Sequence, residues 1–105
     1  MTQTQHDQTH SDLHAASHSE TARQDTAIHG NPELERRVRD VQTRLAHAGT
    51  QDALEAATDQ ALDAYFSAGV HAGLGHLSAL TLARRKTDAL IADEASRRAA
   101  QGGNA

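Results

Sequence analysis

The most regular chemical pattern in the sequence is a series of histidines near the N-terminus. His6, His10, His14 and His18 recur every four residues. Residues four apart share one face of a helix, so each adjacent pair has the spacing of helical ligands for a divalent metal. Successive pairs turn by about 40° around a helix of about 3.6 residues per turn, which predicts a series of two-histidine sites and not one four-histidine cage.

Neutral imidazole suits zinc, copper or nickel, so we hypothesise that this segment binds such ions weakly. The alternative, which its low-complexity composition favours, is a solvated tail with no specific metal. Apart from this metal, no cofactor is expected.

Two further histidines lie in the second half of the chain. His71 and His76 are five residues apart, or about 140° around a continuous helix, which is a poor spacing for one metal site. The two imidazoles meet only if the chain turns between them. We interpret each as a half-exposed histidine with local contacts.

The C-terminal half also carries a basic group, which comprises Arg84, Arg85, Lys86, Arg97 and Arg98. Basic side chains bind phosphates without sequence preference, so nucleic-acid association is one alternative. However, the net charge is -4 and no aromatic residue is interleaved with these side chains. The mixed charge favours a solvated helix face.

No pattern typical of an active site is present. The chain has no cysteine, no glycine-rich phosphate loop, no HExxH motif and no nucleophile elbow. The part expected to fold, about 70 residues, is small for a domain that must also enclose a pocket. We therefore expect no enzymatic activity.

Helices must position all of these side chains. Of the 105 residues, 37% are hydrophobic and only 2% aromatic, which predicts a thin core rich in alanine and leucine. Alanine favours helix, and no segment shows the alternation of a strand. The expected fold class is all-α, either a helical hairpin or a three-helix bundle, with a disordered N-terminal tail.

Composition divides the chain into three parts. Residues 1–30 are rich in His, Gln and Thr and have few large aliphatic side chains, so we expect a disordered tail. Residues 31–100 form the expected helical domain, with helices over 32–48, 51–72 and 76–98; the last two are alternatively one kinked helix. Residues 101–105 are expected to be a frayed C-terminus.

Capping residues predict the first helix boundaries. Asn31 is a typical N-cap, and Pro32 occupies the first helical position, where its missing N–H costs no hydrogen bond. Gly49 is expected to end this helix as its C′ residue, and Thr50 to cap the next one.

Apolar residues at helical spacing predict the contact surfaces. One stripe, on the first helix, alternates steps of four and three residues, the pattern of a seam between two helices; another runs through the segment 62–77. Because so small a domain has a limited core, we expect these stripes to bury against a second copy or a larger partner. The residues assigned to this interface are Leu34, Val38, Val41, Leu45, Leu62, Phe66, Gly69, Val70, Gly73 and Leu77.

The glycines of this interface have two interpretations. As a small-xxx-small pair, Gly69 and Gly73 would let a second helix approach the backbone closely. Alternatively, the residues 73–75, Gly-Leu-Gly, simply connect two helices. The sequence leaves both interpretations open.

The uncharged segment 64–83 has the length of a membrane span and is followed by three basic residues. Histidine, serine, threonine and glycine dilute its hydrophobicity, so a membrane span is an alternative and not the expectation.

Binding explains these features better than catalysis does. We expect a non-enzymatic α-helical interaction or oligomerisation module, regulatory or adaptor in kind, whose partner is a second copy or a larger protein. The expected compartment is the cytoplasm, since the chain lacks cysteine and a secretory signal. The alternatives are a nucleic-acid-associated regulator, a single-span membrane protein and a metal binder.

Overall fold

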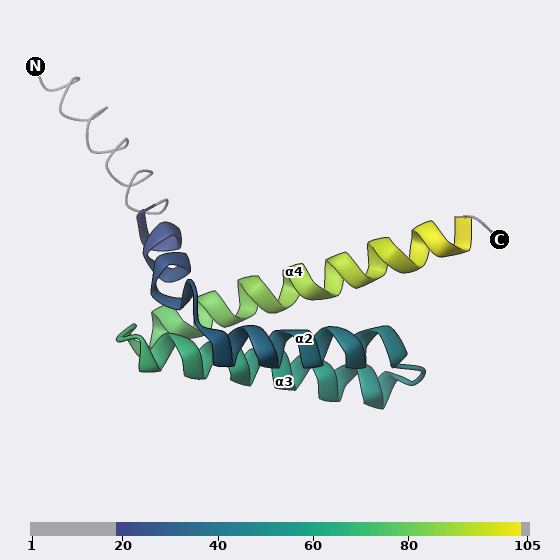
Figure 1. Ribbon diagram of the computed structural model, residues 1–105, viewed down its shortest axis with the longest axis horizontal. Coiled ribbons are helices and arrows are strands. Elements are labelled where there is room, and N and C mark those ends of the chain that lie inside the picture. The colour runs from purple at the N-terminus through teal and green to yellow at the C-terminus, as the bar shows by residue number, and fades with distance from the viewer. Residues whose placement is uncertain (1–18, 104–105) are drawn as a thin grey trace, which may run out of the picture.

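The computed structural model describes residues 19–103, which form helices joined by short turns (Figure 1). The helices are a segment over residues 19–28, α2 over Pro32–His47, α3 over Gln51–His71 and α4 over His76–Gly103. No strand occurs among these residues, so the all-α prediction is confirmed. The helices α2, α3 and α4 begin where predicted. The helix α4 runs past the predicted end at residue 98, where Ala99, Ala100 and Gln101 favour helix, and it includes residues 101–103, so the predicted frayed end is wrong for these three residues.

Side chains that precede α2 and α3 fix the two starts. The Asn31 carboxamide oxygen accepts a hydrogen bond from the Leu34 backbone N–H at 3.1 Å, and Pro32 follows Asn31 directly. The Thr50 hydroxyl accepts from the Ala53 N–H at 3.1 Å. Each cap satisfies an N–H that has no partner within its own helix, as predicted.

The end of α2 differs from the prediction. Its last turn runs into extended backbone at Ala48, and Gly49 does not adopt the left-handed conformation expected of a C′ glycine. Instead, the Arg98 guanidinium of α4 donates hydrogen bonds to the carbonyls of Leu45 and Ala48, at 2.6 and 3.2 Å. The Leu45 carbonyl, which a glycine motif would help to satisfy, therefore accepts from a distant helix as well as from the Ala48 N–H at 3.3 Å, and the C-cap carbonyl of Ala48 gains a partner too.

A glycine motif does end α3. Gly73 has φ of +95°, its N–H donates to the Val70 carbonyl at 3.0 Å, and the Leu74 N–H donates to the Gly69 carbonyl at 2.9 Å. These are the two hydrogen bonds of a Schellman motif with Gly73 at C′. The connection interpretation therefore holds for Gly73, and helices α3 and α4 are separate.

Gly69 fits the interpretation of a small residue at a helix–helix contact, since it lets α4 approach α3 closely. A Cβ atom at this position would lie 3.1 Å from the Ala79 Cβ and 3.2 Å from a Leu74 methyl group. Both distances are shorter than ordinary van der Waals contact, so the close approach requires a residue without a side chain.

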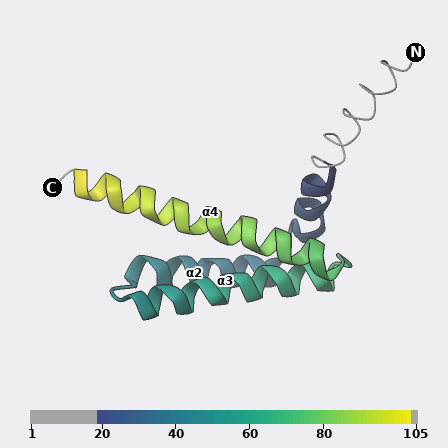
Figure 2. The same cartoon turned by 180° about the vertical axis from the view of Figure 1, so that it is seen from behind.

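The central helix is α3. It runs antiparallel to α2 and has its most extensive contact with α4 (Figures 1 and 2). By contrast, α2 and α4 touch over a small area, and α4 diverges from the α2–α3 pair toward its C-terminal end (Figure 1).

The core is thin and rich in small side chains, as the composition predicts. Leu45 and Leu82 are its largest fully buried apolar side chains, with exposed fractions of 1% and 0%. Within residues 19–103, six of the other twelve buried apolar residues are alanines, which allow helices to pack closely; they are Ala57, Ala61, Ala64, Ala68, Ala79 and Ala83.

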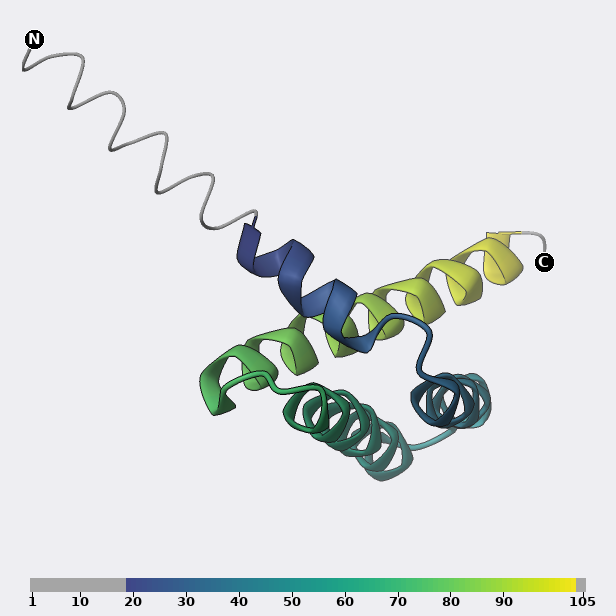
Figure 3. The same cartoon turned by 60° about the vertical axis from the view of Figure 1, so that its left-hand side comes forward.

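Residues 19–28 form a helical segment, here called the arm, which lies across α4 (Figure 3). We predicted a disordered tail through residue 30, and for the arm that prediction is wrong. Ile28 joins the hydrophobic core and Gln24 is buried, so contacts with the rest of the chain stabilise a helix whose own apolar content is small. The rest of the predicted tail, residues 1–18, lies outside the described residues.

Across residues 19–103, no helix combines the length and the apolar character that crossing a membrane requires.

Candidate functional site

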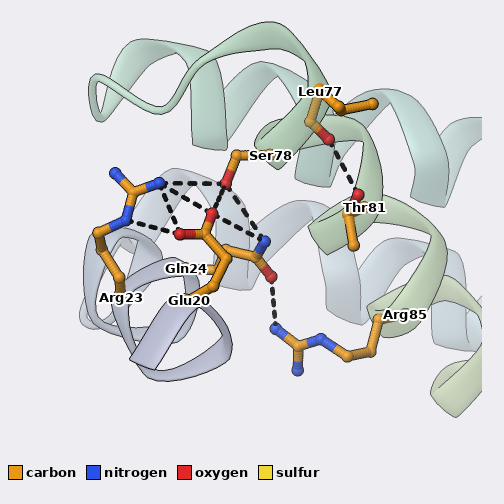
Figure 4. A network of polar contacts seen from close by, with 7 residues as sticks. All are labelled: Glu20, Arg23, Gln24, Leu77, Ser78, Thr81 and Arg85. Atoms are coloured by element: carbon orange, nitrogen blue, oxygen red, sulfur yellow. Dashed lines mark hydrogen bonds and ion pairs between the residues drawn. The ribbon is translucent and has the colours of Figure 1, made fainter. Parts of the chain in front are cut away.

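The arm meets α4 through a network of polar side chains, here called the arm junction (Figure 4). Gln24 lies at its centre and is only 2% exposed. Its amide nitrogen donates to the Ser78 hydroxyl at 3.2 Å, and its amide oxygen accepts from the Arg85 guanidinium at 3.1 Å. Both ends of the carboxamide are therefore satisfied by α4, which offsets the cost of burying a polar group.

Two carboxylates add charge to the arm junction. Asp25 accepts a hydrogen bond from Arg85 at 2.8 Å and lies 3.4 Å from the Lys86 ammonium. Glu20 accepts a short hydrogen bond from the hydroxyl of Ser78 and pairs with Arg23 of the arm at 2.8 Å. The arm thus presents carboxylates to a basic and hydroxyl-bearing stretch of α4.

Both carboxylates have lowered pKa values. The hydrogen bonds from Arg23 and, to a smaller extent, Ser78 lower the pKa of Glu20 from an ordinary 4.5 to about 2. The hydrogen bond from Arg85 lowers the pKa of Asp25, and the charge of Lys86 adds to this effect. A carboxylate whose pKa falls on folding stabilises the folded chain above its ordinary pKa, and this contribution is lost as the pH falls toward the lowered value.

We therefore expect acid to weaken the docking of the arm. Replacing both carboxylates, Glu20→Gln with Asp25→Asn, should lower the free energy of unfolding at pH 7, and the difference from the natural sequence should shrink as the pH falls from about 4.5 to about 2. Urea unfolding followed by circular dichroism at pH 7 and pH 2 measures both differences. Asp88→Asn, at an exposed position of α4, is the matched control. A difference that stays constant with pH would contradict the proposed role of the carboxylates.

A cavity of about 450 Å³ lies beside the arm junction, a volume within the usual range of ligand sites. The arm and the turn after it line one part, α2 another, and single residues of α3 and α4 complete it. Burial raises the pKa of the Tyr65 phenol in this lining. The lining of the cavity mixes apolar side chains with charges of both signs, and it contains no nucleophile paired with a base. The lining residues are Asp25, Ile28, His29, Gly30, Leu34, Glu35, Val38, Arg39, Tyr65 and Lys86.

Four of the five residues of the predicted phosphate-binding group form ion pairs within the chain. Arg85 and Lys86 pair with Asp25 in the arm junction. Arg97 and Arg98 pair with the buried Glu94 at 3.2 and 3.3 Å. The remaining one, Arg84, is exposed. Because paired cations have less free charge to offer to phosphates, this arrangement does not favour the nucleic-acid alternative.

Most residues of the predicted intermolecular interface lie inside the chain's own fold. The seam of α2 is covered by helices of the same chain, because the partner helix that the pattern predicts is intramolecular. Gly73 lies in the turn between α3 and α4. The buried residues are Leu34, Val41, Leu45 and Gly69, and those partly buried against the core are Val38, Leu62 and Phe66.

Besides Gly73 in the turn itself, two predicted interface residues are exposed, and both flank the turn between α3 and α4. Val70 is 44% exposed near the end of α3, and Leu77 is 75% exposed near the start of α4. The predicted apolar stripe required these positions to lie on one continuous helix, and the turn at Gly73 breaks it. We call the surface formed by Val70 and Leu77 the corner.

The histidines of the second half do not form a metal centre. His76 packs edge-to-face on Phe66, with ring centroids 5.0 Å apart, and His71 is exposed at the end of α3. No group of three metal-ligating side chains occurs within residues 19–103. The predicted metal ligands His6, His10, His14 and His18 lie outside the described residues.

Sequence reasoning missed the arm junction. The only apolar signals in the arm are Ile28 and two alanines, and its buried glutamine looks like an ordinary surface residue. The spacing of Glu20, Gln24 and Ile28, at four and four residues, is the signal that places them on one helical face.

No family model, no curated protein and no solved structure matches this chain. The arm junction, the cavity and the corner are therefore the features from which a function is inferred.

Proposed function

We propose that the protein is a small non-enzymatic α-helical interaction module, regulatory or adaptor in kind, which self-associates through the corner. The observation that carries this proposal is the 75% exposure of Leu77 beside a turn where Val70 is also exposed. Single exposed aliphatic residues are common on protein surfaces, but Val70 and Leu77 are the exposed large apolar side chains of the described residues, and they lie on either side of one turn.

The size of the core supports this proposal. In our interpretation α2, α3 and α4 form a three-helix bundle in which alanines supply much of the buried surface. Domains of this size rarely gain more than about 3 to 5 kcal/mol from the core alone, and association adds to that stability. The cytoplasm remains the proposed compartment, and no cofactor is part of the proposal.

The proposal predicts that charge at the corner abolishes self-association. Burying one aliphatic side chain contributes about 1.5 to 3 kcal/mol, so losing Val70 and Leu77 from each copy should weaken dimerisation at least ~100-fold. The variant carries Val70→Asp and Leu77→Asp together. Light scattering after size exclusion, over a range of concentrations, measures the mass of this variant and of the natural sequence.

Ala89→Asp places the same charge at an exposed position elsewhere on α4 and serves as the control. Circular dichroism establishes that all three chains are folded. A folded double variant with the same concentration-dependent mass as the natural sequence, or a natural sequence that remains monomeric throughout, would show that the corner is not a self-association surface.

A further inference from the structure

The contacts of the arm define what its site on α4 accepts. The site offers the Ser78 hydroxyl and the Arg85 guanidinium to one carboxamide, which reaches them at 3.2 and 3.1 Å. It offers Arg85 and Lys86 to the neighbouring carboxylate. A matching helix therefore presents adjacent amide and carboxylate side chains, with an aliphatic residue one turn later in the position of Ile28.

An empty site would be unfavourable. Without the arm, Arg85 and Lys86 would lose the carboxylate between them, and the core would lose Ile28. The Nε of Arg85 is already buried without a hydrogen-bond partner among the described residues. Removing the arm would take away the two side-chain acceptors of this guanidinium and leave it to water, so an occupant of the same chemistry would stabilise the site.

The connection between the arm and α2 depends on a single backbone conformation. It consists of His29, Gly30 and Asn31, and Gly30 has φ of +70°. Nothing lies within 4 Å of the place where a Gly30 Cβ would sit, and both His29 and Gly30 are exposed. Packing therefore does not hold the connection, and an extended Gly30 would direct the arm away from its own α4.

We propose that two copies of the chain exchange arms, so that residues 19–28 of each copy occupy the site on α4 of the other. The side-chain contacts of the arm junction do not depend on both sides belonging to one chain, and a second copy carries the required sequence by definition. In the exchanged pair, Asp25 and Ile28 of one copy complete the cavity beside Tyr65 and Lys86 of the other. This exchange uses a surface separate from the corner and does not depend on self-association there.

Charge reversal tests the exchange. One chain carries Asp25→Lys, and the other carries Arg85→Glu with Lys86→Glu, so that in either chain alone the arm and its own site repel each other. Both chains also carry Val70→Asp and Leu77→Asp, which remove association at the corner. After mixing, each arm is complementary to the other chain's site. Native mass spectrometry, which separates the two chains by mass, should show each chain alone as a monomer and the mixture mainly as a one-to-one heterodimer.

The outcomes separate exchange from association elsewhere on the chain. With the corner removed from both chains, any association that does not involve the arm would give homodimers of each chain and a statistical mixture of three dimers. That statistical mixture, or a mixture that stays monomeric, overturns the exchange. A heterodimer without homodimers supports it. All three charge-reversing substitutions in one chain restore the attraction within the arm junction, and circular dichroism of that chain shows whether the reversed charges permit folding.

A second variant tests the connection without altering the contacts. Gly30→Val disfavours φ of +70° and favours an extended connection, so it should raise the dimer association constant at least tenfold. Gly49→Val introduces the same side chain into the α2–α3 connection, where the glycine has no positive φ and no close neighbour, and should leave the constant unchanged. Equal behaviour of the two variants contradicts the exchange, and this comparison holds even if the charge-reversed chains fail to fold.

Discussion

Replacing Leu82 by alanine should remove a large part of the stability of this protein. The Leu82 side chain is 0% exposed on the face of α4 that packs into the core. Truncation of a buried leucine to alanine costs about 2 to 5 kcal/mol, because the apolar contact is lost and a cavity remains. Small domains have a stability of about 0.05 to 0.15 kcal/mol per residue, so this loss is a large part of the total and the variant should unfold at a much lower urea concentration. Urea unfolding and far-ultraviolet circular dichroism measure the loss.

Leu77→Ala provides the matched control for this prediction. It makes the same change on the same helix, five residues away, where the side chain is 75% exposed. Its expected effect on the monomer is within about 0.5 kcal/mol, as for most surface substitutions. If the two variants lose equal stability, the face of α4 assigned to the core is wrong.

Replacing Gly69 by valine should have the next largest effect. Its Cβ would lie 3.1 Å from the Ala79 Cβ, and the two further methyl groups would need space that α4 occupies. Overpacking of this kind costs about 1 to 3 kcal/mol, because the helices must separate or the side chain must leave its preferred rotamer. The measurement is again the free energy of unfolding in urea.

Gly102→Val is the control, because Gly102 is also helical but has open space where a Cβ would sit, with no neighbour within 4 Å. We expect this change to be neutral within about 0.5 kcal/mol. A neutral Gly69→Val would mean that α3 and α4 are not in close contact at this point, and the small-residue interpretation of Gly69 would be wrong.

The starts of α2 and α3 were predictable from the sequence, because the residues that fix them act on nearby backbone groups. Asn31, Pro32 and Thr50 act through backbone groups within three residues, so their roles are visible in a short stretch of sequence. The glycines show the limit of such reasoning. Gly69 and Gly73 have similar surroundings in the sequence, and only the path of α4 decides that one permits close packing and the other a turn.

The partner of an apolar stripe was not predictable in the same way. The spacing of Val41 and Leu45 indicates that a helix packs there, but it carries no information on whether that helix belongs to the same chain.

The arm was missed for a related reason. Gln24 is buried because Ser78 and Arg85, more than fifty positions away, provide its hydrogen bonds, and no local pattern records such partners. The exposure of the corner likewise follows from the turn at Gly73.

The hydrogen bonds from Arg98 to the end of α2 have a consequence for the order in which the chain matures on the ribosome. Translation produces α2 before α4, so until α4 packs beside α2 the Ala48 carbonyl must rely on water and the Leu45 carbonyl on the Ala48 N–H alone. Gln24 of the arm likewise lacks its hydrogen-bond partners on α4 until Ser78 and Arg85 have been synthesised. The first helix of an α2–α3 hairpin therefore keeps an open C-terminal end until α4 packs beside it.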